Sequence, residues 1–362
     1  SAASAASASS ASASSEPDAA SCASHRLGRL DTHTVDERAL QRLRESLLWT
    51  AHDDEDARRS GWSLLKYASM ANDAPAVRAL LRRAASLSRE ARRRLVESPS
   101  HQAMTHLHIL SPKGGRCLHM AMWLGCTETV PLLLAAGADA YAVDGTLGTH
   151  ALSIAAAFGQ HDAVDLWLQA IPSFDVNLPS HEVSGGMPAL HLSAFQVPHD
   201  GLRMLRALLE HGAAPSFVTS SGRTLPISAA LNEDCEPDVL HEVCGRTRPH
   251  FGIDTPVVPR KLRWRLIFSL MARKYRRGDR SNLVQHLAYI NGATPLMCAA
   301  RRGDAVAVAQ LIAEGADPTA RNALGMSVLD VAAAFGPFPI VQQQLEAAID
   351  ADRAAAAGPH AG

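Results

Sequence analysis

Histidine and cysteine are the side chains of this chain that are numerous enough to suggest metal or nucleophilic chemistry. There are 17 histidines and six cysteines among 362 residues. The densest histidine group is His101, His106, His108 and His119, and imidazole is a common zinc ligand. No HExxH motif, no Cys/His pair at zinc spacing and no nearby thiol or carboxylate partner accompanies this group. The sequence therefore predicts neither a metal site nor a cofactor.

The other sequence motifs of catalysis are also missing. The chain has no GxxxxGK phosphate loop, no GxSxG nucleophile elbow, no GxGxxG turn and no kinase signature. Acidic pairs such as Asp139 and Asp144 have no nucleophile beside them. The cysteines lack CxxC or disulfide-framework spacing, which favours free, buried thiols in a reducing compartment. We therefore expect a protein that is not an enzyme.

Composition limits the classes of partner. A formal net charge of −1 gives no overall attraction to nucleic acid or to a membrane, so we expect no nucleic-acid partner. No apolar run reaches the roughly 18 residues that a spanning helix needs, so no stable membrane insertion is expected. Residues 1–24 are rich in Ala and Ser without Lys or Arg, which gives only weak support to organellar targeting. A cytoplasmic or nuclear location is predicted.

A repeated pattern organises most of the chain, and residues 291–322 hold its most complete copy, NGATPLMCAARRGDAVAVAQLIAEGADPTARN. Thr294 can cap a helix through its hydroxyl, and Pro295 suits the first helical position, where no N–H is needed. Gly303 then ends this first helix. A second apolar helix follows and stops at Gly315, because glycine adopts the left-handed conformation easily. The segment predicts a pair of antiparallel helices.

This unit resembles the ankyrin repeat, whose signature of Gly-x-Thr-Pro-Leu-His, Ala-Ala, Gly, Leu-Leu and Gly-Ala-Asp recurs about every 33 residues. Seven units are recognisable, and they begin at Gly61, Gly114, Gly148, Gly186, Gly222, Gly292 and Gly325. The long interval between Gly222 and Gly292 corresponds to two periods, so residues 260–288 are expected to form one further unit. The resemblance implies an all-α ankyrin-repeat solenoid of about eight helix-turn-helix units with β-hairpin-like finger loops.

The same pattern suggests the organisation of the chain. We expect a disordered Ala/Ser-rich tail, a capping helix, the repeat array with two insertions, and a C-terminal tail. These segments are 1–34 for the first tail, 35–60 for the capping helix, 61–348 for the array, 83–113 and 233–291 for the insertions, and 349–362 for the last tail.

The resemblance also suggests a binding surface. In the ankyrin family, the two residues before the mid-repeat glycine face the concave groove, and four of the seven such pairs here contain an aromatic residue although aromatics make up only 5% of the chain. One interpretation is an apolar stripe that holds a partner segment; the other is packing against the next finger or an insertion. The predicted partner-binding residues are Trp123, Leu124, Phe158, Phe195, Arg301, Arg302 and Phe335.

Residues 259–277 combine many Arg and Lys side chains with an apolar helical face. A basic amphipathic helix can contact an anionic surface or enter a calmodulin-like groove, and either contact is a possible weak interaction of this segment. The alternative is that the segment is the long first helix of the inferred extra repeat, with its arginines in solvent.

The sequence as a whole predicts a non-enzymatic protein–protein interaction module. It would act as a scaffold, adaptor or regulatory subunit that binds another protein on its concave face. Two alternatives remain open: a regulatory ankyrin region of a larger enzyme or channel, or a structural subunit of a large assembly.

Overall fold

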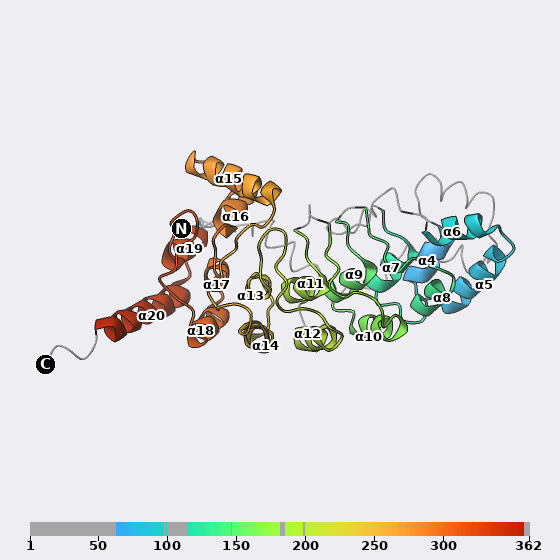
Figure 1. Cartoon of the computed structure of the whole chain (residues 1–362), viewed down its shortest axis with the longest axis horizontal. Helices are drawn as coiled ribbons and strands as arrows, with labels where there is room; N and C mark the ends of the chain where they lie inside the picture. Colours follow the sequence, from blue (N-terminus) through green and yellow to red (C-terminus); the bar gives the residue numbers. More distant parts are fainter. Residues whose placement is uncertain are drawn as a thin grey trace, which may run out of the picture.

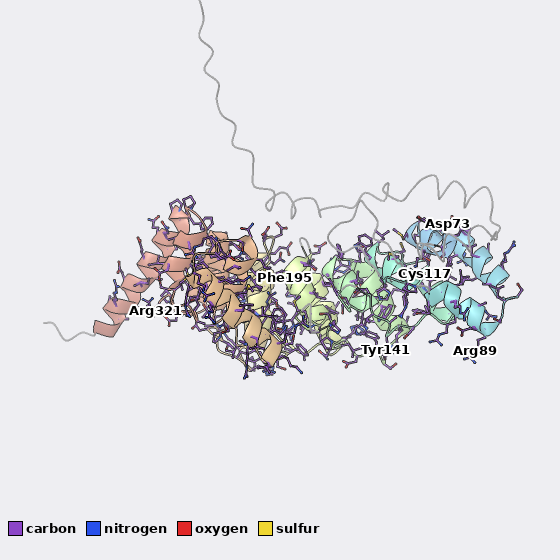
Figure 2. All side chains as sticks on the ribbon, turned by 90° about the horizontal axis from the view of Figure 1, so that it is seen from above. Asp73, Arg89, Cys117, Tyr141, Phe195 and Arg321 are labelled. Atoms are coloured by element: carbon purple, nitrogen blue, oxygen red, sulfur yellow. The ribbon has the colours of Figure 1, made fainter. Side chains whose placement is uncertain are left out.

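The computed structural model describes residues 63–97, 99, 114–145, 147–181, 185–197 and 200–357. This part of the chain is helical, and its helices form one elongated row (Figure 1). Asp73 and Arg321 lie toward opposite ends of the row, with Phe195 between them (Figure 2). The tail expected at 1–34 and the capping helix expected at 35–60 lie outside the described residues.

Seven helix pairs stack along the row in the part of the chain that the structure describes. The first helices of the pairs are α4 (Leu64–Met70), α7 (Cys117–Trp123), α9 (Ala151–Ala157), α11 (Ala189–Gln196), α13 (Leu225–Ala230), α17 (Pro295–Arg302) and α19 (Val328–Phe335). The second helices are α5 (Ala74–Ala84), α8 (Val130–Ala135), α10 (His161–Ala170), α12 (Gly201–Glu210), α14 (Pro237–Thr247), α18 (Ala305–Ala313) and α20 (Pro339–Ala357). The predicted all-α solenoid is confirmed.

Local sequence signals begin and end these helices as expected. The Thr294 hydroxyl accepts a hydrogen bond from the Met297 N–H at 3.4 Å, and α17 starts at Pro295. The helix ends at Gly303, whose φ of 73° is in the left-handed region. The Asp304 carboxylate then caps α18 by accepting from the Ala307 N–H at 2.9 Å.

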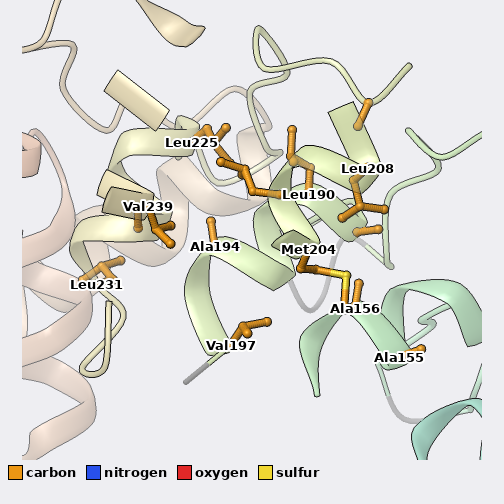
Figure 3. Packing of buried hydrophobic residues seen from close by; sticks show 14 of the residues in the cluster. Ala155, Ala156, Leu190, Ala194, Val197, Met204, Leu208, Leu225, Leu231 and Val239 are labelled. Atoms are coloured by element: carbon orange, nitrogen blue, oxygen red, sulfur yellow. The ribbon is translucent and has the colours of Figure 1, made fainter. Parts of the chain in front are cut away.

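Small side chains on the first helices allow neighbouring pairs to pack closely. Ala155 and Ala156 of α9 and Ala194 of α11 are buried, and these two helices pack against each other. From the second row, Met204 points toward Ala156 and Leu208 adds to the same cluster (Figure 3). The result is one continuous apolar core that runs through successive pairs.

The expectation of an extra stacked repeat at 260–288 is wrong. Helix α17 packs directly on α13, and α18 packs on α14, so no pair lies between them in the row. Helices α15 (Leu262–Arg276) and α16 (Asn282–Ile290) instead pair with each other and project to one side (Figure 1). The inserted segment is as long as one repeat, which is why glycine spacing alone suggested a stacked unit.

The inserted segment is also shorter than the expected 233–291, because α14 belongs to the stack. Two backbone hydrogen bonds close its base: the Val257 N–H donates to Ala293 O at 3.0 Å, and the Gly292 N–H donates to Val257 O at 2.9 Å. The chain therefore leaves the row after Val257 and returns at Gly292. We call residues 258–291 the α15–α16 insertion.

Two other boundaries differ from the expectation. Helix α20 continues to Ala357, past the expected end of the array at 348, because its alanine-rich end has high helix propensity. The first part of the insertion expected at 83–113 contains α6 (Arg89–Glu97), which buries Leu95 and Val96 against the core. None of the described helices is long and apolar enough to cross a membrane.

Tyr289 fastens the α15–α16 insertion to the row. Its side chain is 1% exposed, and its hydroxyl donates to Met297 O at 2.5 Å. Its ring packs edge-on against Phe335 with 5.3 Å between centroids. The Asn322 side chain donates to Tyr289 O at 3.2 Å, so contacts from both α17 and the last finger hold this residue.

Replacing Tyr289 with Phe should lower the free energy of unfolding by about 1–2 kcal/mol, because the Met297 carbonyl loses its buried donor. Urea denaturation of the two proteins measures the difference. Tyr141→Phe is the matched control: this side chain is 50% exposed and its hydroxyl is 3.5 Å from Ser173 O. Equal losses in the two variants would contradict the fastening role.

Candidate functional site

The predicted groove residues do not form one continuous stripe. Trp123 and Phe158 belong to an apolar cluster at α7 and α9. Phe195 lies beside Arg223, and Phe335 lies beside Arg301, near the α15–α16 insertion. The structure thus divides the candidate groove into an apolar part and a part rich in cations and aromatic rings.

Trp123 is buried rather than displayed. Its side chain is 4% exposed and packs with Met70 and Met120. The Phe158 ring meets it edge-on at 5.8 Å between centroids, and Phe158 itself is partly exposed. The Trp123 carbonyl accepts from the Gln160 side chain at 3.0 Å, which ties this turn to the next unit. The buried Trp123 ring therefore packs against Phe158, and Phe158 is the ring that reaches the surface.

A pocket opens beside Phe158. It is small, with about 40 Å³ of space that solvent can occupy, and apolar atoms make up most of its wall. Its lining residues include Trp123, Ile154, Ala157, Phe158, Leu192 and Gln196. Three successive first helices contribute to it, so the pocket exists only when these units are stacked. Its apolar lining and small size suit a small apolar group of a partner.

The second part of the groove concentrates positive charge against aromatic faces. The Arg223 guanidinium lies 5.9 Å from the centre of the Phe195 ring. The Arg301 guanidinium lies 4.8 Å from the Phe335 ring centre and 5.7 Å from that of Tyr289. Within the described residues, neither arginine has a carboxylate partner in an ion pair. Cation–π contact therefore holds both guanidinium groups.

These cations also affect one another. Burial, together with the charges of Arg301 and Arg223, lowers the pKa of His286 to about 3. Burial likewise lowers the pKa of Arg223, and the charge of Arg301 adds to this effect. The region is thus a desolvated cluster in which positive groups repel one another.

Sequence reasoning missed Arg223, His286 and Tyr289 in this cluster. Tyr289 and His286 come from the α15–α16 insertion, whose position no sequence spacing reveals. Arg302, in contrast, is less available than expected: its side chain is 8% exposed and pairs with Asp304 at 2.5 Å. Leu124 is partly buried against the core. The roles of Arg302 and Leu124 in partner binding stay predictions.

His119 makes structural hydrogen bonds with both ring nitrogens. His119 Nδ1 accepts from the Arg116 N–H at 3.4 Å, so Nε2 carries the proton and donates to Ala142 O at 3.1 Å. Burial lowers the pKa of His119 to about 4. No group of three or more potential metal ligands exists among the described residues, while His101, His106 and His108 lie outside them.

Comparison with known proteins agrees with the stacked helix pairs. A family model of three ankyrin repeats matches residues 118–219, and a model of a single ankyrin repeat matches residues 291–323. This chain is an ankyrin-repeat protein. A similar solved structure is the crystal structure of the ankyrin repeat domain of Bcl-3, described as a unique member of the IkappaB protein family. It has 19% identity and a TM-score of 0.50, over 79% of this chain and 99% of that chain. A search of curated proteins gave no match.

The burial of Trp123 predicts a difference between two groove variants of this ankyrin-repeat protein. Trp123→Ala should lower the free energy of unfolding by about 3–5 kcal/mol, because it leaves a large cavity under α7 and α9. Phe158→Ala should cost less than half of that, since the ring is already partly exposed. Urea denaturation gives both values, and equal costs would contradict the arrangement. Phe158 is accordingly the better position for testing binding.

The neutral His119 predicts a pH dependence of stability. Its pKa is about 4 in the folded protein, against an ordinary value of 6.5, so between these pH values the unfolded chain binds a proton that the folded chain does not. Its contribution is complete above pH 6.5 and is lost as the pH falls toward 4, with a slope of about 1.4 kcal/mol per unit. His119→Gln should reduce the slope by this amount in denaturation series. The same change at the exposed His211 is the control, and an unchanged slope in His119→Gln would contradict the assignment.

Proposed function

We propose that this ankyrin-repeat protein is a non-enzymatic adaptor that binds an extended segment of another protein in its concave groove. The observation that carries the proposal is the pocket at Phe158 followed, in the next units of the row, by the cation and aromatic cluster of Phe195, Arg223, Arg301 and Phe335. A segment that lies along the row meets these two surfaces in turn. Its chemistry is therefore an apolar anchor followed by acidic side chains.

The apolar part supplies the first contact. The Phe158 ring packs against the buried Trp123 ring, so it loses little conformational entropy when a partner covers it. Buried aromatic anchors and well-formed pockets are the usual energetic centres of protein interfaces. A small aliphatic group of the partner would occupy the pocket lined by α7, α9 and α11.

The cationic part supplies selectivity for acidic residues. Arg223 and Arg301 are fixed against aromatic rings, which leaves guanidinium N–H groups that can donate to a carboxylate. An incoming carboxylate would also offset the mutual repulsion that lowers the pKa of His286. A basic segment would be repelled by these arginines and would not bind.

Cysteine chemistry supports a binding role over a catalytic one. Burial raises the pKa of Cys117 to about 12 and that of Cys126 to about 11. It also raises the pKa of Cys235 and Cys244 to about 12, and that of Cys298 to about 11. These thiols stay protonated at neutral pH, and the thiolate is the nucleophilic form.

Selection from a random peptide display library with the whole chain as bait tests this proposal. We expect enriched peptides that place an apolar residue before one or more acidic residues. Phe158→Ala should weaken a selected peptide by at least about tenfold through lost apolar contact. Arg301→Gln should weaken it to a similar extent, and only while the peptide keeps its acidic residue.

Two controls make the result decisive. Arg78→Gln removes an exposed charge from α5, outside this cluster, and should leave peptide affinity unchanged. Salt titration should weaken wild-type binding more than that of Arg301→Gln, because screening acts on the carboxylate contact. Peptides without acidic residues, or equal binding by all variants, would overturn the proposed use of the groove.

A further inference from the structure

The α15–α16 insertion carries an apolar surface that the stack does not use. Ten large hydrophobic side chains are exposed in the described part of the protein. Five of these ten lie in or beside the two helices of this insertion: Val258, Leu262, Leu266, Leu270 and Leu283. The rest are scattered along the row. Exposed apolar residues concentrated in this way usually mark a contact surface.

Helix α15 is apolar on two opposite sides. Phe268 is 1% exposed and packs beside Trp264, with 5.7 Å between ring centroids. Leu262, Leu266 and Leu270 follow one another at four-residue spacing and are 69%, 62% and 51% exposed. Two residues turn a helix by about 200°, so Leu266 points away from Phe268. The aromatic side packs inward, and the leucine side has no partner among the described residues.

Positive charge surrounds the leucine side. No Asp or Glu occurs from Thr255 to Gly278, although the whole chain has a net charge of only −1. By helical position, Arg263 and Lys274 lie on one flank of the three leucines, and Arg265 and Arg276 lie on the other. All four of these basic residues are exposed. By the same geometry, the exposed Arg273 follows Leu270 on the leucine side. The surface is an apolar stripe with cations along both edges and at its C-terminal end.

We propose that α15 docks this protein on an anionic lipid bilayer, with Leu262, Leu266 and Leu270 in the interfacial layer. Helices of this kind lie in the plane of the interface while long basic side chains extend to the lipid phosphates. Helix α15 projects from the row (Figure 1), and its three leucines are exposed, which suits contact with a flat surface. An acidic protein helix would be held in a groove, whereas the three leucines are 51–69% exposed.

Contacts at the base of the insertion connect the lipid-binding helix to the row. The hydrogen bonds between Val257 and the Gly292–Ala293 segment fix its base, and Tyr289 is buried against α17 and Phe335. Lipid contact at α15 therefore orients the groove relative to the membrane. The inference does not depend on the peptide chemistry proposed for that groove.

Co-sedimentation of the full chain with lipid vesicles tests the proposal. We expect binding to vesicles of equimolar phosphatidylserine and phosphatidylcholine and none to phosphatidylcholine alone. Leu266→Gln with Leu270→Gln should abolish sedimentation while the protein unfolds as the wild type does, since both side chains are exposed. Neutralising Arg273, Lys274 and Arg276 with Gln should weaken binding by about two orders of magnitude at low salt.

Matched controls separate this contact from general adhesion. Val306→Gln with Ile340→Gln changes two equally exposed apolar residues outside the insertion and should leave sedimentation unchanged. Arg78, Arg82 and Arg93 changed to Gln remove the same charge from α5 and α6 and should also have little effect. Phe158→Ala should bind vesicles normally, which distinguishes this site from the groove.

Three outcomes would overturn the proposal. One is an absence of wild-type binding to the phosphatidylserine vesicles. Another is binding that survives the two leucine substitutions, which would indicate charge adhesion alone. The third is wild-type binding to a soluble acidic amphipathic helix, lost in the leucine variant, without binding to vesicles. That result would assign the stripe to a protein partner.

Discussion

The structure depends on the close packing of each helix pair on the next. A single pair leaves one apolar side exposed, so every unit needs a neighbour on each side of its core. The alanines of α9 and α11 permit the short separation that this burial requires. The same demand decides the course of the chain after α14: α17 must cover α13, so the intervening segment leaves the row.

That constraint explains how a segment of one repeat length became a separate structure. Because the stack is already complete without it, the α15–α16 insertion contacts the row mainly through residues near its two ends. These are Arg260 and Lys261, whose N–H groups donate to Ser220 O, and Tyr289. Its outer side is free to be both leucine-rich and basic, which no stacked helix could be. In the same position, Tyr289 and His286 change the groove beside Phe335 and Arg301 into a desolvated cationic region.

The groove accordingly depends on contributions from several elements. The support of Phe158 by Trp123 links α7 with α9, and the pocket beside them also needs α11. Arg301 is held by rings from α16 and α19, one in the insertion and the other in the following unit. Repeat position drew attention to Phe158, Phe195, Arg301 and Phe335, whose roles in partner binding stay predictions. It could not distinguish a supporting ring such as Trp123 from a displayed one, because burial is set by neighbouring units.

The sequence by itself determined the helix pairs, their caps and their period, because these rest on contacts within a few residues. Thr294, Pro295 and Gly303 each act through the local backbone, and the ankyrin fold follows from their recurrence. The tertiary structure alone decided which helices stack, since residues 258–291 match the period in length but not in position. The tertiary structure also decided which aromatic rings are exposed and which arginines lack a carboxylate partner, because these properties arise from contacts between different units.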